Sequence, residues 1–295
     1  MAAPTLGRED RRAIQELNGA MLGSAPPAMR AGFAVLSRAL PAAAERLATW
    51  LFCRPATTKA SSSELTTLRS GERFRMKAAG CDLAAWSWGH GPAVVLHHGW
   101  NGSASHMARF VRPLLGAGFR VVAYDAPAHG ASSGRVSAVP EMARVLRAVA
   151  VELGGIHGVV AHSMGGAVVM LAVRLGMRLE SGVLLASPAD LRGFLDIFGD
   201  HLGLSPRIRE GIARRTAARY RMRWSEMNVE SWADGETPPM LLVHDRADPA
   251  VPWAHANRIR RVWSGAELLT TTGLGHSGVR RDAAVIERAV AFLSA

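Results

Sequence analysis

In this 295-residue chain, the residue whose type and surroundings best suit nucleophilic chemistry is Ser163. It follows the apolar run 158–162, precedes the helix-like run 167–171, and lies between small residues at Ala161 and Gly165. A serine in a sharp strand-to-helix turn needs such neighbours, because its strained backbone brings the flanking residues against other main-chain atoms. Glycine is usual at both flanks, and Ala161 is the smallest substitute for the first. The pattern predicts a nucleophile elbow.

Partners for this serine occur later in the chain. A serine hydroxyl needs a general base, and the base needs an acid that orients it. His276 lies in a glycine-rich loop after the strand-like run 267–270. Asp248 follows the strand-like run 240–243, and Asp245 is a rival acid just before it. Because ligand sites of open α/β sheets gather beyond the carboxyl ends of strands, we expect these side chains to meet the serine there.

The elements that would position these residues alternate along the chain. Strand-like runs lie at 72–78, 82–88, 93–97, 120–124, 158–162, 182–186, 240–243 and 267–270. Candidate helices lie near 104–116, 139–153, 165–178, 254–263 and 281–294. Several strand-like runs are continuous in Val, Leu and Ala, which is typical of strands covered on both faces. The alternation predicts an α/β fold with a mainly parallel central sheet and helices on both faces.

One interval breaks this alternation. Roughly fifty residues before Met240 hold no convincing strand, which is long for a connection in such a fold. Ile208, Ile212, Tyr220 and Trp224 recur at multiples of four, as on one face of a helix. We predict a helical cap insert at about 188–238, within a main domain at 64–295.

The first 63 residues form a separate predicted unit, a helical extension. Apolar residues recur there at near-helical spacing, broken by Pro41. The serine run 61–63 is interpreted as a linker to the main domain. An arm packed on the main domain is the favoured interpretation. A membrane-surface helix, a homodimer contact and a flap over the active site are the alternatives.

From about residue 72 to its end, the chain resembles the α/β-hydrolase superfamily, in the group of capped esterases and lipase-like hydrolases. Five motifs occur in the family's order, namely His98-Gly99-Trp100, the loop 124–132, the elbow 161–165, the acid loop 244–252 and Gly275-His276. Three positions depart from the family pattern, since Ala128, Ala161 and Asp245 stand where glycine is usual. The resemblance implies the α/β-hydrolase fold with a helical cap insert.

The resemblance also implies a role for each site residue. Ser163 would be the nucleophile, His276 the general base and then the general acid, and Asp248 the group that orients His276. The backbone N–H groups of Trp100 and Met164 would form the oxyanion hole. The implied reaction is hydrolysis of a small-molecule ester or related acyl bond through an acyl-enzyme, as in a carboxylesterase. No cofactor and no metal would be needed.

Other polar residues near the predicted strand ends are interpreted as structural. Asp248 is favoured over Asp245 because the Val-Pro pair after it fits the family's acid loop. Asp125 follows the wrong strand for a nucleophile. The remaining histidines near strand ends lack the ligand spacing of a metal site and are expected to form structural hydrogen bonds, namely His97, His98, His129, His162 and His244.

The substrate stays open at this stage, because fold and triad do not fix it. A thioesterase, a lipase, an amidase or a C–C bond hydrolase could use the same three residues. A non-catalytic hydrolase-like binding protein is the alternative outside enzymes. Five apolar residues are candidates for a pocket but are favoured as core, namely Trp100, Met107, Phe194, Phe198 and Trp224.

The formal net charge is +11, and nearly all of the positively charged residues are arginines. Seven arginines lie in the insert, namely Arg207, Arg209, Arg214, Arg215, Arg219, Arg221 and Arg223. We interpret them as a solvated helix face. Attraction of an anionic substrate is the alternative. The arginines are otherwise spread along the chain without interleaved aromatic residues. We therefore expect no nucleic-acid partner.

The remaining composition predicts a cytoplasmic protein. Hydrophobic residues make up 48% of the chain, which suffices for a sizeable core. Cys53 and Cys81 show neither metal-ligand nor disulfide spacing, which is typical of a reducing compartment. We find no signal peptide and no apolar run of about 18 residues, so no integral membrane segment is expected. Peripheral membrane contact is left open.

Overall fold

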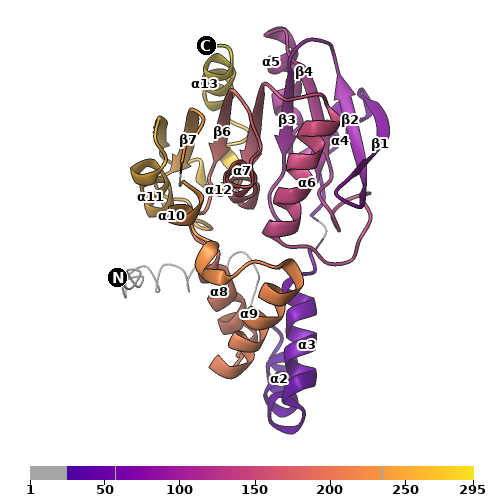
Figure 1. Cartoon of the computed structure of the whole chain (residues 1–295), viewed down its shortest axis with the longest axis vertical. Helices are drawn as coiled ribbons and strands as arrows, with labels where there is room; N and C mark the ends of the chain where they lie inside the picture. Colours follow the sequence, from indigo (N-terminus) through magenta and orange to yellow (C-terminus); the bar gives the residue numbers. More distant parts are fainter. Residues whose placement is uncertain (1–24, 57, 234) are drawn as a thin grey trace.

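The computed structural model describes residues 25–56, 58–233 and 235–295, and its main body is a sheet between helices (Figure 1). Residues 1–24 of the predicted extension lie outside the described residues. The described strands form one eight-stranded sheet in the order β1-β2-β4-β3-β5-β6-β7-β8. Their bounds are β1 Glu72–Ala78, β2 Cys81–Trp88, β3 Ala93–His97, β4 Arg120–Tyr124, β5 Gly158–His162, β6 Ser181–Leu185, β7 Met240–Asp245 and β8 Ala266–Thr271.

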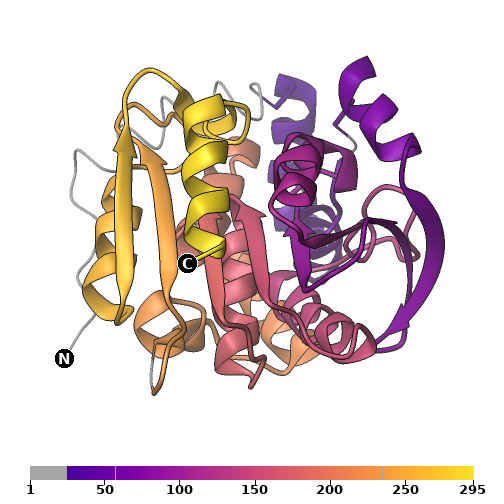
Figure 2. The ribbon, with the colours of Figure 1, turned by 90° about the horizontal axis from the view of Figure 1, so that it is seen from above.

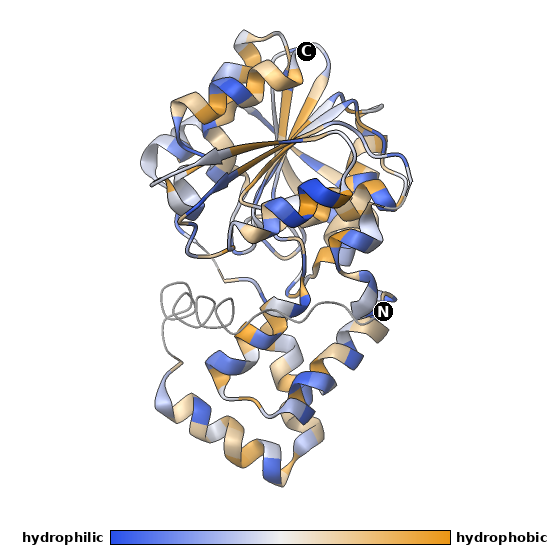
Figure 3. Cartoon of the chain, turned by 90° about the vertical axis from the view of Figure 1, so that its left-hand side faces the viewer, coloured by the Kyte–Doolittle hydropathy of each residue, from blue (hydrophilic) through white to orange (hydrophobic). Residues whose placement is uncertain are grey.

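Strand direction and burial follow the sequence pattern. β2 runs antiparallel to β1 and β4, and all other neighbouring strands are parallel. The central strands β3, β5 and β7 are buried throughout, which accounts for their continuous apolar runs. Figure 3 shows these strands as the hydrophobic centre of the molecule. The α/β fold with a mainly parallel sheet is confirmed.

Helices cover both faces of the sheet (Figure 2). Alternate residues of β3 divide between the two cores, with Val95 on one side and Val94 on the other. One core is completed by α6 (Val139–Glu152), α7 (Met164–Arg174) and α11 (Ala254–Val262). The other is completed by η1 (Ala104–Phe110), α5 (Val111–Gly116) and α13 (Ala283–Leu293).

The prediction that residues 61–63 form a linker is wrong. Ser61 caps the helix α4 (Ser62–Arg69), where its hydroxyl accepts the N–H of Glu64 at 3.3 Å. The Glu64 carboxylate accepts the N–H of Ser61 at 2.8 Å in return, which completes a capping box. Glu64 is buried and forms an ion pair with Arg280 at 3.0 Å. Serine at this position therefore starts a helix that packs on the main domain.

A group of helices lies below the sheet in Figure 1, formed by two segments that are far apart in the sequence. The first segment, which we call the arm, contains α2 (Pro27–Ala39) and α3 (Pro41–Phe52). The second, which we call the insert, contains α8 (Arg192–Leu202), α9 (Pro206–Tyr220), η2 (Trp224–Glu226) and α10 (Val229–Trp232).

The arm packs on the insert through a core of their own. Phe33 and Ala48 of the arm are buried with Leu195, Ile208 and Ile212 of the insert. The carboxylate of Glu45, which is only 8% exposed, lies 3.5 Å from Arg214 and 3.4 Å from Arg215. Arm and insert together form one helical cap.

The prediction that four residues of the insert share one face of a helix is wrong for the last of them, Trp224. Ile208, Ile212 and Tyr220 lie on α9, but α9 ends at Tyr220 and Arg221 adopts a positive φ of 51°. Trp224 belongs to the separate turn η2, from which its indole N–H donates to the carbonyl oxygen of Ala213 at 3.0 Å. The chain thus reverses between Tyr220 and Trp224.

In the described ranges, no helix is long and apolar enough to cross a membrane.

Candidate active site

Ser163 occupies a strained turn between β5 and α7, with φ of 54° and ψ of −126°. Close packing explains the small residues around it. A Cβ on Gly165 would lie 2.7 Å from the carbonyl oxygen of His98, so a side chain there would displace the neighbouring loop. Ala161 is the last but one residue of β5 and is fully buried between β3 and β6, where its methyl group joins the core. The turn therefore accepts alanine in place of the usual glycine.

The three predicted catalytic side chains lie within hydrogen-bond distance of one another. Nε2 of His276 lies 3.0 Å from Oγ of Ser163, and Nδ1 lies 2.9 Å from Oδ2 of Asp248. A carboxylate can only accept, so Nδ1 carries the proton and Nε2 is left free to accept the serine proton. Asp248 follows β7, and His276 lies in the short helix α12 (Gly275–Gly278) that follows β8. Because β5, β6, β7 and β8 run parallel, both loops leave the sheet at the same edge as the turn that carries Ser163.

Backbone N–H groups hold the Asp248 carboxylate in place. Its Oδ1 accepts the N–H groups of Ala250 at 2.7 Å and Val251 at 2.9 Å. The ring of His244 lies against the other oxygen, with Nε2 3.5 Å from Oδ2, while the same nitrogen donates to the carbonyl oxygen of Val251 at 2.8 Å. These contacts fix the carboxylate so that Oδ2 faces His276.

Asp245, the rival acid, points to a different set of partners. Its Oδ2 accepts the hydroxyl of Thr271 at 2.8 Å and the N–H of Leu274 at 3.0 Å, and its Oδ1 accepts the N–H of Ala247. Burial raises the pKa of this carboxyl, but the hydrogen bonds outweigh burial and hold the pKa below its ordinary value. Asp245 thus holds the loop that carries His276 instead of contacting the imidazole.

The predicted oxyanion donors lie against the nucleophile. Met164 is the first residue of α7, so its N–H belongs to a helix N-terminus, where the dipole favours negative charge. A Cβ on Gly99 would lie 3.0 Å from Cβ of Ser163, which shows how closely the loop after β3 approaches the elbow. Trp100, Met164 and Ser163 line the same cavity.

His98 joins the loops after β3 and β4. Its Nδ1–H donates to the carbonyl oxygen of Gly99 at 2.7 Å, and its Nε2 accepts the N–H of Ala126 at 2.9 Å. Asp125 acts similarly, since its two oxygens accept the N–H groups of Ala104 at 2.8 Å and Ala131 at 2.7 Å. Both residues position the loop that carries Trp100 and contact no part of the triad.

One histidine that the sequence did not assign to the site contacts His276, the predicted general base. Nε2 of His162 lies 2.9 Å from the carbonyl oxygen of His276, and the two rings lie 4.8 Å apart. Burial and the neighbouring His276 lower the pKa of His162 well below its ordinary value, so the ring is neutral and donates this hydrogen bond. Its position directly before Ser163 is the signal that could have identified it.

Two further histidines make the fold sensitive to acid. Burial lowers the pKa of His97 and of His129 from 6.5 to about 4, so both are neutral in the folded protein. In the unfolded chain they take up protons below about pH 6.5. Each therefore contributes stability that is present above pH 6.5 and is lost as the pH falls towards 4, up to about 3 kcal/mol per histidine.

The replacement His129→Asn tests this acid sensitivity. Asparagine can keep the hydrogen bond that Nδ1–H of His129 donates to the carbonyl oxygen of Pro127 at 2.9 Å. We expect the loss of unfolding free energy between pH 7 and pH 5 to be about 2 kcal/mol smaller in the variant, because one proton uptake is removed. Urea unfolding at both pH values measures this. An equal loss in both proteins would contradict it.

A cavity of about 480 Å³ contains the candidate site. Ser163 and His276 line it, and the rest of its lining comes from the insert, from the end of the arm and from loops of the main domain, among them residues 99–102 and 137–140. Of the predicted pocket candidates, Trp100, Phe194, Phe198 and Trp224 line this cavity, and Met107 is buried in the core. None of the seven insert arginines lines it; its arginines are Arg54 and Arg280.

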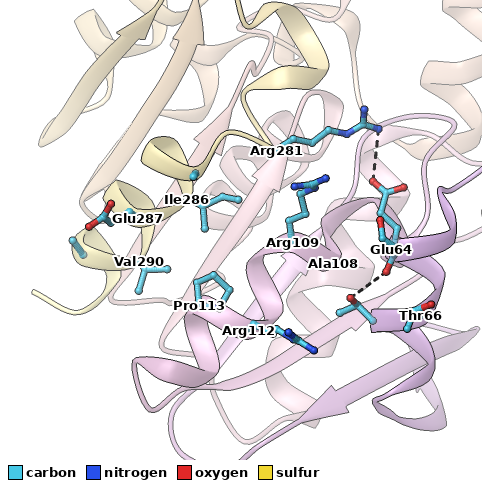
Figure 4. Close-up of a pocket in the computed structure, with 14 residues that line it drawn as sticks. Glu64, Thr66, Ala108, Arg109, Arg112, Pro113, Arg281, Ile286, Glu287 and Val290 are labelled. Carbon is cyan, nitrogen blue, oxygen red and sulfur yellow. Dashed lines mark hydrogen bonds and ion pairs between the residues drawn. The ribbon is translucent and has the colours of Figure 1, made fainter.

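A larger and more open cavity of about 960 Å³ lies between α4, α5 and α13 (Figure 4). Arg109, Arg112 and Arg281 lie along it with the apolar residues Ile286 and Val290. None of the predicted catalytic residues lines it, so its size does not make it the candidate active site.

Within the described part of the chain, no group of three His, Cys, Asp or Glu side chains is placed to hold a metal ion.

Comparison with known sequences gives one family and one curated relative. The family model described as "Alpha/beta hydrolase family" matches residues 94–288. A serine hydrolase-like protein of Danio rerio is 36% identical over 141 residues, which span 44% of this chain and 41% of that protein. The match therefore covers about two fifths of the relative's length.

Solved structures share the fold at low sequence identity. The esterase Pf2001 of Pyrococcus furiosus is 20% identical with a TM-score of 0.60, covering 81% of this chain and 95% of that one. The esterase EaEST of Exiguobacterium antarcticum is 16% identical with a TM-score of 0.57, covering 76% of this chain and all of that one (100%). At such identities the similarity shows the fold alone.

Proposed function

Because the chain belongs to the alpha/beta hydrolase family, we propose that it is a serine hydrolase that cleaves a carboxylic ester or related acyl bond through an acyl-enzyme. The observation that carries the proposal is the hydrogen-bonded series from Ser163 to His276 to Asp248, with heavy-atom distances of 3.0 and 2.9 Å. A serine hydroxyl within reach of an imidazole that a carboxylate orients is the arrangement that activates a hydroxyl for attack on a carbonyl carbon.

The first half of the proposed reaction forms the acyl-enzyme. Nε2 of His276 takes the hydroxyl proton as Oγ of Ser163 attacks the carbonyl carbon. The N–H groups of Trp100 and Met164 donate to the oxyanion of the tetrahedral intermediate. Removing one such donor typically costs about 3 kcal/mol of barrier. His276 then passes the proton to the leaving alcohol, and Asp248 stabilises the imidazolium while it exists.

The second half releases the acid. A water molecule enters where the alcohol left, and His276 takes one of its protons as it attacks the acyl carbon. The second tetrahedral intermediate collapses, and His276 returns the proton to Ser163. This route uses side chains and backbone N–H groups of the chain alone. The esterase names of the compared structures and the family membership support this choice of substrate class.

A fluorophosphonate probe tests the proposal directly, because it reacts only with an activated serine. We expect one label per chain, mapped by peptide mass spectrometry to Ser163, together with hydrolysis of short p-nitrophenyl esters. His276→Ala should slow labelling at least about a hundredfold, since the general base is lost. A non-catalytic binding protein would leave Ser163 unlabelled and the esters intact, and either result would refute the proposal.

A further inference from the structure

The arm contributes directly to the cavity that contains Ser163. Leu51 and Phe52, at the end of α3, line it together with Phe194 and Phe198 of α8. The ring of Phe52 meets that of Phe198 edge-on at 5.3 Å and lies 6.2 Å from the ring of Trp224. Edge-to-face contacts of this kind are favourable, so arm and insert close this side of the cavity as one wall.

Three hydrogen bonds hold the chain that leaves α3 against the catalytic domain. We call this segment, residues 53–56 and 58, the strap. The carbonyl oxygen of Cys53 accepts the N–H of Ser137 at 2.8 Å. The N–H of Ala56 donates to Oδ1 of Asn101 at 2.6 Å, and the N–H of Thr58 donates to the backbone oxygen of Asn101 at 3.1 Å.

Asn101 therefore connects the strap to the oxyanion loop. It directly follows Trp100, one of the two proposed oxyanion donors. Its φ of 63° lies in the left-handed region, which asparagine tolerates better than most residues. Its side chain and its carbonyl oxygen both accept from the strap. Asn101 and the contact of Cys53 with Ser137 thus tie the end of the arm to the main domain near Ser163, in addition to the packing of the arm on the insert.

The chemistry of the wall indicates what it would receive. The side chains that arm and insert present there are mainly aromatic and aliphatic, and no arginine of the insert lines the cavity. An uncharged apolar group fits this part of the cavity, because the four rings and side chains named above offer no charged partner there, while Arg54 and Arg280 line other parts of it. The cavity volume of about 480 Å³ suits one small ligand.

We infer that the arm is a specificity-determining part of the active site: Phe52, held by the strap and Asn101, limits the length of an apolar acyl chain bound at Ser163. This inference rests on the proposed function. The substrate class is then an ester with an uncharged, apolar acyl chain of limited length. Each methylene that the wall buries should raise reactivity about fourfold, until the chain meets Phe52.

Alkyl fluorophosphonates of increasing chain length measure this without knowledge of the natural substrate. In the unmodified protein we expect the rate of Ser163 labelling to rise with chain length and then fall. In Phe52→Ala the fall should move to longer chains, with the ratio of long-chain to short-chain labelling increased about tenfold or more. Phe198→Ala removes the opposite side of the same contact and should shift the fall in the same direction.

Leu47→Ala is the matched control on the same helix. Leu47 lies in α3, is 42% exposed and does not line the cavity. It should keep the chain-length profile of the unmodified protein. Thermal melts of each variant show whether the cap remains folded, and Phe198→Ala decides the question if Phe52→Ala does not fold.

A pair of substitutions at Asn101 tests the strap as a positioning device. Asn101→Gly keeps the left-handed backbone but removes the acceptor for the N–H of Ala56, so chain-length discrimination should flatten while short-chain labelling persists. Asn101→Asp keeps an acceptor and should restore the discrimination. If Ser163 is labelled but Phe52→Ala, Phe198→Ala and Asn101→Gly all leave the profile unchanged, the inference is wrong. If no probe labels Ser163, the proposed function fails with it.

Discussion

Replacement of Ser163 by alanine is expected to lower kcat/KM for short p-nitrophenyl esters by about a millionfold. The reason is that Oγ of Ser163 is the only atom of the site that would form a bond to the acyl carbon. Alanine keeps the Cβ and therefore the same strained backbone, so the fold should survive. Circular dichroism and the melting temperature of the variant, compared with the unmodified protein, check this separately from activity.

The double variant Ser163→Ala with His276→Ala tests whether the two residues act as one catalytic unit. Residues that act as one unit lose their contribution together, so the second substitution should cause almost no further loss. The small activity left above the uncatalysed rate would come from substrate binding and from the N–H groups of Trp100 and Met164. Ester hydrolysis retained by Ser163→Ala would exclude the acyl-enzyme mechanism.

Asp248→Asn should lower kcat by about ten-thousandfold while changing KM little. The amide cannot stabilise the imidazolium, and it can present an N–H to Nδ1 of His276. The proton would then shift to Nε2, which lies 3.0 Å from Oγ of Ser163 and would no longer accept the serine proton. The loss would thus arise from the wrong tautomer of an otherwise intact site.

Asp245→Asn is the matched control, because both carboxylates are buried and lie in the same loop region. Asp245 accepts hydrogen bonds from Thr271 and Leu274 but none from His276. Its substitution should lower the melting temperature and reduce kcat about tenfold or less. If Asp245→Asn abolished turnover while Asp248→Asn did not, the assignment of the acid would be reversed. Steady-state kinetics on one ester series decides between them.

The positions of the site residues could be predicted because the signals for them are local. Ser163 directly follows β5, and Asp248 and His276 lie in the loops after β7 and β8. Parallel strands bring their carboxyl ends to the same edge of a sheet. The strand-like runs were predicted to within one or two residues. For the central strands β3, β5 and β7 the reason is that a fully buried strand must be continuously apolar. Asp248 and Asp245 were separable only through the loop residues after them.

The helical character of the insert was predicted, but its packing with the arm was not, because that packing depends on contacts between distant segments. Nothing near Glu45 in the sequence indicates that Arg214 and Arg215 lie beside it. The role of Asn101 likewise depends on a partner that precedes it by 45 residues. The serine run 61–63 was misinterpreted for a local reason. The start of a capped helix and a polar linker have similar composition, so the serines alone do not distinguish them.

The division of the cap between two distant segments also affects how the protein folds. The guanidinium of Arg30 donates to the carbonyl oxygen of Asp200 at 3.0 Å across 170 residues of chain. Closing so large a loop is entropically costly and slow, so the arm must wait until most of the sheet is formed. During synthesis the arm leaves the ribosome first and finds its partner late. Until the arm docks, the side of the Ser163 cavity that Leu51 and Phe52 line would stay open. The limit on chain length that we infer for Phe52 would therefore be the last property of the site to form.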